Sequence, residues 1–387
     1  MVKSFSVTST PSIIFGVGKR RELPQLIQKF GKNVLVVTGS GSFSKSDYGS
    51  QLLNEIQSVN GICHFASIPG EPTPEMIDET VAKYSQITFD VLIALGGGSV
   101  LDGGKAISAM LGKSDSIVDF LEGVGTRNPD GSKIPFIAVP TTAGTGSEAT
   151  KNAVISRVGE DGFKKSLRHD NYIPNIAVVD PELTVSCSKE TTAASGLDAF
   201  TQLLEAYVST KSSPFIDALA VDGLTNVVKY LKPAWEDGKS LEARSGMSYA
   251  AMLSGIALAN SGLGTVHGFA SSVGGMFPIP HGVVCGTLMA ECAAFTIEKL
   301  AKSSEAYLKY ANVGRLVSSK ANETDEYYCH ILTDYLRRLT EELKIPTLSS
   351  FGVTKEIIPQ LSAVTENKNN PVTFNTEELS YILEKRL

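Results

Sequence analysis

The stretch LIALGGGSVLDGGKA, residues 92–106, joins a run of apolar residues directly to a glycine-rich turn and then to a helical pattern. The glycines at 96–98 and Ser99 carry little or no side chain, so their backbone N–H groups can approach an anion closely. The partial positive charge at the start of the following helix would lie beside them. This is not a Walker loop, because Ser99 stands where its first glycine belongs and Ala106 where its Ser or Thr would hold magnesium. The stretch predicts a buried strand that ends at a pyrophosphate-binding turn.

Short apolar runs of the same kind alternate with helical stretches between about residues 34 and 180. They are NVLVVTG (33–39), GICHFASIPG (61–70), FDVLIALGGGS (89–99), KIPFIAVPTT (133–142) and NIAVVDPEL (175–183). Continuous apolar runs indicate strands that are covered on both faces, which is typical of a parallel sheet. After Asp180-Pro181 the apolar residues recur at three- and four-residue spacing, as in helices. We therefore expect an α/β domain over residues 1–184 and an all-helical domain over residues 185–387, with a cleft between them.

Two further strand ends are rich in glycine and hydroxyl groups. VVTGSGSFS (36–44) nearly fits a GxGxxG pattern, with Ser44 in the third place, and VPTTAGTGSEAT (139–150) places threonines and serines among glycines. Either turn alone is a weak signal, and a plain turn is as good an interpretation of it. Because the ends of parallel strands meet at one edge of a sheet, three such turns predict a common crevice.

Four side chains form a candidate metal site. Asp198 and Gln202 are four residues apart, so on a helix both can reach a common point from one face. His267 and His281 could join them, giving two oxygens and two imidazole nitrogens, a set that suits Fe²⁺, Zn²⁺ or another divalent ion. The alternative is that the histidines are two unrelated, hydrogen-bonded core residues, which is the commoner situation for such a pair.

The chain between the two histidines decides whether they can meet. They lie in TVHGFASSVGGMFPIPHG (265–282), where Pro278 and Pro280 exclude one straight helix. Gly274-Gly275 would let the chain double back at that point. The spacing permits the histidines to converge.

Charge and cysteine content narrow the function classes. The 387 residues carry a formal net charge of −6 with no run of Lys and Arg, which argues against nucleic acid as a partner. Five cysteines without a CxxC pair indicate reduced thiols rather than disulfides or a thiolate zinc site. The start, MVKSFSVTSTPSII, has no signal-peptide pattern, and no stretch approaches the roughly 18 apolar residues of a membrane span. We expect a cytoplasmic protein that does not contact a membrane.

Five segments together resemble the iron-containing (group III) alcohol dehydrogenase family, in order and in spacing. They are GGGSVLDGGK, PTTAGTGSE, DPEL, SGLDAFTQLLEAYVS and HGFASSVGG followed by PHG. The resemblance covers nearly the whole chain. It implies an α/β nucleotide-binding domain with a parallel sheet, an all-α domain in a dehydroquinate synthase-like architecture, and a divalent metal in the cleft. The implied reaction is hydride transfer between NAD or NADP and a small alcohol or aldehyde, in a homodimer or larger homo-oligomer.

The resemblance also assigns residues. The family's catalytic metal ligands fall on Asp198, His267 and His281, and its pyrophosphate turn falls on Gly97, Gly98 and Ser99. An acidic position near the nicotinamide falls on Asp102, two threonines that contact the cofactor fall on Thr141 and Thr142, and a lysine near the adenosine ribose falls on Lys164.

Two departures from the family pattern concern the metal and the proton. Gln202 stands where the family usually has a histidine, and an amide oxygen is a poorer ligand than imidazole for iron or zinc. Ser271 stands where many members carry a histidine that assists proton movement. We expect weaker metal binding through Gln202, and a proton path through cofactor hydroxyls or water.

A third departure concerns the choice of cofactor. Members that prefer NAD often carry an aspartate after the strand at 33–38, where its carboxylate binds the ribose 2′-OH and repels a 2′-phosphate. This chain has Gly39, Ser40, Gly41 and Ser42 there. Hydroxyls and free backbone N–H groups would accept a 2′-phosphate, so the sequence predicts a preference for NADP(H).

Two other functions remain as alternatives. A dehydroquinate synthase-like lyase would need basic residues in the helical cleft for its phosphate-bearing substrate, and no Lys or Arg stands close to the metal motifs in the sequence. A nucleotide-binding protein whose metal site decayed at Gln202 would bind NADP without redox turnover.

Overall fold

The computed structural model describes residues 4–40, 46–59, 61–160 and 162–387. Its amino-terminal part contains a six-stranded parallel sheet in the order β1-β8-β5-β4-β2-β3. The strands are β1 (Ser12–Phe15), β2 (Asn33–Thr38), β3 (Ile62–Ser67), β4 (Val91–Gly96), β5 (Phe136–Pro140) and β8 (Ile176–Val179). An antiparallel pair, β6 (Asn152–Arg157) and β7 (Phe163–Arg168), forms a separate hairpin beside the sheet.

Helices cover both faces of the sheet, which explains why its central strands are apolar throughout. Every residue of β4 and β5 is buried. Leu92 and Ala94 belong to one core with α3 (Pro74–Lys83), α4 (Gly98–Met110) and the β6–β7 hairpin. Ile93 and Leu95 belong to the opposite core with α1 (Leu23–Gln28) and α2 (Asp47–Val59). The parallel α/β sheet predicted from the sequence is confirmed.

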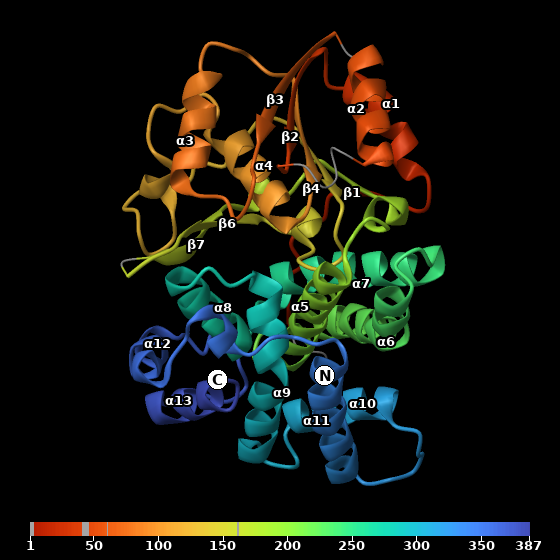
Figure 1. Cartoon of the computed structure of the whole chain (residues 1–387), viewed down its shortest axis with the longest axis vertical. Helices are drawn as coiled ribbons and strands as arrows, with labels where there is room; N and C mark the ends of the chain where they lie inside the picture. Colours follow the sequence, from red (N-terminus) through yellow and green to blue (C-terminus); the bar gives the residue numbers. More distant parts are fainter. Residues whose placement is uncertain (1–3, 41–45, 60, 161) are drawn as a thin grey trace.

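The second half of the chain is helical, as predicted, and it lies beyond the carboxyl ends of the central strands (Figure 1). Its helices are α5 (Lys189–Val208), α6 (Pro214–Glu236), α7 (Leu241–Ser261), α8 (Thr265–Met276), α9 (His281–Lys299), α10 (Glu305–Val317), α11 (Asp325–Glu342), α12 (Ile358–Val364) and α13 (Thr376–Glu384). Short 3-10 turns lie at Lys19–Glu22, Ile117–Phe120, Ser147–Ala149, Asp170–Tyr172, Pro181–Thr184, Leu348–Phe351 and Lys355–Ile357. Within the described ranges, no helix is both long and apolar enough to cross a membrane.

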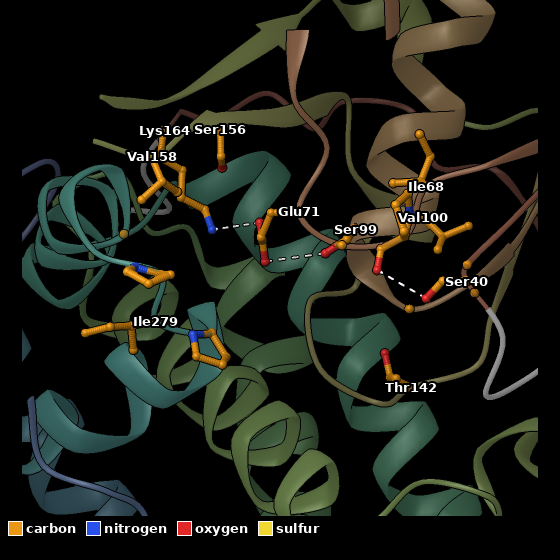
Figure 2. A pocket seen from close by; sticks show the side chains of 18 of the residues that line it. Ser40, Ile68, Glu71, Ser99, Val100, Thr142, Ser156, Val158, Lys164 and Ile279 are labelled. Atoms are coloured by element: carbon orange, nitrogen blue, oxygen red, sulfur yellow. Dashed lines mark hydrogen bonds and ion pairs between the residues drawn. The ribbon is translucent and has the colours of Figure 1, made fainter. Parts of the chain in front are cut away.

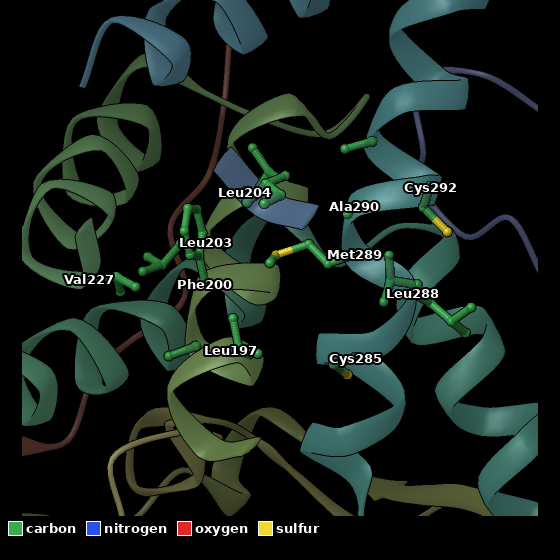
Figure 3. Close-up of a cluster of buried hydrophobic side chains, with 14 of the residues drawn as sticks. Leu197, Phe200, Leu203, Leu204, Val227, Cys285, Leu288, Met289, Ala290 and Cys292 are labelled. Carbon is green, nitrogen blue, oxygen red and sulfur yellow. The ribbon is translucent and has the colours of Figure 1, made fainter. Parts of the chain in front are cut away.

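Helix α5 is the centre of the helical part. It begins at a serine cap, Ser188, whose side chain accepts the N–H of Thr191, and it is buried over most of its length. Its apolar residues pack against α6 and α9, as Figure 3 shows for Phe200 and Leu203 beside Val227 and Met289. The polar residues of α5 therefore sit in an apolar surrounding, where each one needs a partner.

Three short strands were not predicted from the sequence. β1 has only four residues, SIIF, and none of them is fully buried. The hairpin strands β6 and β7 carry polar and charged residues, and in FKKSLR of β7 the buried residues are Lys164 and Leu167, with Arg168 exposed. Buried and exposed residues do not alternate in β7, so its sequence lacks the pattern that predicts a half-buried strand.

The chain reverses between the two histidines at a different place from the one we expected. Gly274 and Gly275 lie inside α8, which continues to Met276. The turn follows at residues 277–280, where the two prolines cannot extend a helix, and α9 begins at His281. Extended backbone at Phe277 and Pro280, rather than glycine flexibility, redirects the chain.

Candidate functional site

A cavity of about 570 Å³ lies where the carboxyl ends of the central strands face the helical part (Figure 2). Residues from β2, β4 and β5 form one wall, and the turn before α9 forms another. Its lining is Gly39, Ser40, Ile68, Pro69, Gly70, Glu71, Leu95, Gly96, Gly97, Ser99, Val100, Thr141, Thr142, Ser156, Val158, Lys164, Gly274, Phe277, Pro278, Ile279 and Pro280.

All three glycine-rich turns contribute to this cavity. Gly39 and Ser40 follow β2, Gly97 and Ser99 follow β4, and Thr141 and Thr142 follow β5. Gly97 caps α4, so the first N–H groups of that helix face the cavity end of the sheet. Ser42 lies outside the described residues.

Glycine is required at the turn after β4 by close packing. A Cβ on Gly96 would lie 2.5 Å from Val100 Cβ, and one on Gly98 would lie 2.5 Å from Thr145 Cγ2. Gly98 thus packs against the loop after β5 and does not line the cavity. The three glycines let the two loops approach each other and leave backbone donors open toward the cavity.

Asp102 lies behind the turn and is not part of the cavity lining. Its carboxylate accepts the N–H of Val154 at 3.0 Å and the hydroxyl of Ser147, and it lies 3.7 Å from the Lys105 ammonium. Burial raises the pKa of Asp102 even though Lys105 opposes that shift. The structure therefore shows Asp102 fastening the β6 hairpin to α4.

Lys105 lies buried between the same segments and forms hydrogen bonds to them. Its ammonium donates to Ser147 O at 2.9 Å, to Thr150 Oγ1 at 2.9 Å and to Asn152 O at 2.7 Å, and its side chain is almost completely buried. Burial lowers the pKa of Lys105 to about 8, so the amine remains mostly charged at neutral pH. It connects the loop after β5 with the start of β6.

We expect Lys105→Met to lower the free energy of unfolding by about 3 kcal/mol, because it removes the ammonium that donates to two backbone carbonyls and the positive charge beside the Asp102 carboxylate. Thermal melts would show this as a midpoint lower by at least about 5 °C. Lys83→Met, on the exposed side of α3, is the matched control and should stay within about 0.5 kcal/mol of the parent. An unchanged midpoint for Lys105→Met would contradict this role.

Lys164 reaches the cavity from β7 and forms an ion pair that the sequence did not predict. Its ammonium donates to Glu71 Oε2 at 2.9 Å, and Glu71 Oε1 also accepts the Ser99 hydroxyl at 3.4 Å. Burial would raise the pKa of Glu71, but Lys164 outweighs this effect and the pKa is lowered. Figure 2 shows Lys164 and Ser40 at opposite ends of the cavity.

Next to that cavity, α5, α8 and α9 bring together the side chains predicted to bind a metal. Asp198 Oδ1 lies 3.4 Å from His267 Nε2 and 3.6 Å from His281 Nε2. Cys285 joins them, and one ligand atom from each of the four residues lies within 4.8 Å of the others. Asp198, His267 and Cys285 are buried, and His281 is partly buried. The two histidines are therefore not independent core residues.

A second layer of contacts orients these groups. His267 Nδ1 lies 2.6 Å from Glu205 Oε2, while Glu205 Oε1 accepts the N–H of Val266 at 2.7 Å. If Nδ1 carries the proton and donates to Glu205, Nε2 presents a lone pair to the cluster, which is the usual arrangement of a metal-binding histidine. Gln202 lies one turn from Asp198 on α5, and its Oε1 accepts the Ser254 hydroxyl at 3.2 Å.

The cluster has the properties of a cation site. Asp198 Oδ1 is buried and has no hydrogen-bond partner among the described residues. Burial alone would raise the pKa of Asp198, but the two imidazoles overcome it and lower the pKa to about 2. Burial raises the pKa of the Cys285 thiol to about 11. A buried carboxylate oxygen, two imidazole nitrogens and a sulfur around one point are a donor set that fits a divalent metal.

Several residues of this site were missed from the sequence. Cys285 follows His281 by four residues and Glu205 follows Asp198 by seven, and both spacings place the pairs on one helix face. These spacings were the available signal. No such sequence signal was available for Glu71, because the turn after β3 lacks the glycine-rich motif found after β2, β4 and β5.

No Lys or Arg stands close to the metal motifs in the sequence, but two lysines from distant parts of the chain lie near them in the structure. The charge of Lys164 acts on His281, and that of Lys368 acts on Glu205 and Cys285. Lys368 Nζ lies 3.4 Å from the hydroxyl of Ser271, one turn after His267 on α8. The loop that carries Lys368 is distant in sequence, so its arrival beside α8 could not be read from the motifs.

Comparisons with known proteins identify the family. Residues 10–181 match the family model described as "Iron-containing alcohol dehydrogenase", and residues 192–387 match "Fe-containing alcohol dehydrogenase family, C-terminal". The chain is 29% identical to the NADPH-dependent butanol dehydrogenase of Clostridium saccharobutylicum, over 96% of this chain and 95% of that protein. It is 29% identical to the NAD-dependent methanol dehydrogenase of Bacillus methanolicus, over 97% and 98%. The structure of an archaeal halo-thermophilic alcohol dehydrogenase from a Red Sea brine pool superimposes with a TM-score of 0.90 at 26% identity, covering 100% of this chain and 99% of that one.

Proposed function

The chain belongs to the iron-containing alcohol dehydrogenase family and is an NAD(P)-dependent alcohol oxidoreductase, and on that premise we propose which of its residues carry the reaction. The cavity under the glycine turns holds the dinucleotide. Asp198, His267 and His281 hold a divalent metal, with Gln202 beside them. The observation that carries this proposal is that three phosphate-type turns line one cavity and a buried donor cluster from three helices lies next to it.

The amino-terminal residues bind and aim the cofactor. Gly97 and Ser99 offer N–H and hydroxyl donors to the pyrophosphate at the start of α4, and Thr141 and Thr142 offer hydroxyls beside them. Lys164 lies at the end of the cavity near His281, which favours a contact with the nicotinamide half rather than with the adenosine ribose. Asp102 supports the turn from behind and has no direct cofactor contact in this proposal.

The helical residues bind the substrate oxygen and keep water away. A divalent ion supplies Lewis acidity, which polarises an aldehyde carbonyl or lowers the pKa of an alcohol. Glu205 holds His267 in position, and Phe277 and Ile279 close the cavity on the side of the helices. Ser271 donates its proton to His267 O at 3.0 Å, so it does not replace a proton-relay histidine, and that role would fall to water or to hydroxyls of the bound cofactor.

The reaction to assay is hydride transfer to small primary aldehydes, measured once with NADPH and once with NADH. The two cofactors named for the butanol and methanol dehydrogenases differ, so the family leaves the choice open. The Gly39-Ser40 turn supports NADP(H). A homodimer or larger homo-oligomer is part of the same proposal, and gel filtration with light scattering tests it.

Metal content is the most direct test of the site. Protein purified without chelator should hold about one equivalent of iron or zinc by plasma mass spectrometry, and His281→Ala or EDTA treatment should remove it. The parent protein after mock dialysis is the control for EDTA. Protein that takes up no iron, zinc or manganese would instead support the alternative of a decayed site that only binds nucleotide.

A further inference from the structure

Cys285 occupies a ligand position that neither the motif pattern nor the family assignment gives it. It follows His281 by one turn on α9, and its sulfur lies 3.6 Å from His267 Nε2 and 3.8 Å from His281 Nε2. The side chain is completely buried. Among the described residues, no other cysteine belongs to a group of possible metal ligands.

The separations match those of a tetrahedral zinc site. With Zn–N and Zn–O near 2.1 Å and Zn–S near 2.3 Å, tetrahedral geometry places nitrogen and oxygen about 3.4 Å apart, and sulfur and nitrogen about 3.6 Å apart. The observed distances are 3.4 and 3.6 Å from Asp198 Oδ1 to the two nitrogens, and 3.6 and 3.8 Å from Cys285 Sγ to them. Four of the six separations thus match ligand spacing, and all four donor atoms lie within 4.8 Å of one another.

Gln202 has a different orientation. Its side chain forms a hydrogen bond with Asp198, and its Oε1 lies 3.2 Å from the Ser254 hydroxyl, which has a nearer acceptor in Ala251 O at 2.7 Å. Because an ionised carboxylate can only accept, the amide NH₂ is the group that reaches Asp198, and an NH₂ group has no lone pair for a metal. Gln202 thus holds the carboxylate in place.

We propose that the Cys285 thiolate, and not the Gln202 amide oxygen, is the fourth protein ligand of the metal, and that it makes the site one for zinc. The proposal rests on the proposed metal site. A thiolate is a soft ligand that suits zinc, whereas the amide oxygen is a poor one. On binding, the thiol releases its proton to solvent and the sulfur forms the bond to the metal. Gln202 is a positioning residue for Asp198.

Cobalt substitution tests the sulfur ligand without any assay of turnover. Metal-free protein titrated with Co²⁺ should develop a near-ultraviolet thiolate-to-cobalt charge-transfer band that saturates at about one equivalent. Cys285→Ser should abolish the band and weaken zinc binding by more than about 100-fold, beyond the usual loss for an outer-shell partner. Cys292→Ser, the same change at a buried position two turns along α9, should keep both.

Gln202→Ala separates a ligand from a positioning residue. It should retain the charge-transfer band and lose only about 10- to 100-fold in zinc affinity, as expected when a second-layer hydrogen bond is removed. Zinc-edge X-ray absorption of the unmodified protein gives a second measurement that needs no variant, and should show one sulfur at about 2.3 Å.

The outcomes are decisive in either direction. A cobalt spectrum without the thiolate band, or a zinc shell of nitrogen and oxygen alone, would overturn the proposal. So would a band that survives Cys285→Ser. A bound metal with the sulfur signature but no alcohol or aldehyde turnover would refute the proposed function and leave this inference standing, whereas turnover without the signature would do the reverse.

Discussion

His267→Ala is expected to lower kcat for aldehyde reduction by at least about 1000-fold while the Kd for NADPH changes less than about threefold. Loss of this imidazole takes away a metal ligand from the centre of the cluster, where it lies 3.4 Å from Asp198 Oδ1. It also leaves Glu205 without its 2.6 Å partner. His267 itself does not line the cofactor cavity, and the glycine-rich turns of that cavity belong to the other half of the chain, so dinucleotide affinity should survive.

Steady-state kinetics with butanal and a fluorescence titration with NADPH measure the two effects separately. The titration also shows that the variant is folded, because the strand-end turns must be intact to bind the cofactor. His330→Ala, the same change at an exposed position on α11, is the control and should keep full activity. Retained turnover in His267→Ala would refute the metal assignment.

Most of the sheet could be predicted because its strands are buried on both faces. β4 and β5 contain only apolar residues up to their glycine and proline ends, and a run that short and that apolar is typical of a strand inside a parallel sheet. β1 and the β6–β7 hairpin could not be predicted, because their residues are half-exposed. Whether such a segment forms a strand depends on the strand with which it pairs. For β1 that partner is β8, more than 160 residues away in the chain.

The site was predictable where its residues share a local motif and unpredictable where they meet only through packing. Asp198 and Gln202 share a helix face, and the two histidines flank one break, so their convergence was a reasonable expectation. Cys285 and Glu205 lie on the same helix faces as predicted site residues. Cysteine, however, is usually buried, and a buried glutamate is usually ion-paired, for reasons unrelated to a metal. Lys368 comes from a loop that follows α12, and no local pattern indicates where a loop will lie.

The geometry of the turn after β2 makes cofactor choice testable by one substitution. Gly39 lines the cavity, and a Cβ there would meet Val100 Cγ2 at 3.4 Å and Ile68 O at 3.8 Å, which are ordinary contacts. Gly39 is not among the glycines with positive φ. A side chain therefore fits at this position without strain, and its absence leaves room for a 2′-phosphate beside Ser40.

With the native Gly39, we expect kcat/KM to be at least about 10-fold higher with NADPH than with NADH. Gly39→Asp should reverse this preference, with kcat/KM for NADPH falling by about 100-fold, because a carboxylate beside the 2′-phosphate is a repulsive like-charge contact. The same carboxylate can accept the 2′-OH of NADH, so activity with that cofactor should hold or rise. Gly39→Ala adds the same Cβ without the charge and should keep the preference for NADPH, which separates electrostatic repulsion from loss of space. Equal or higher kcat/KM with NADH in the unmodified protein would contradict the proposed preference, and the Ser40 hydroxyl and backbone donors would then serve the ribose alone.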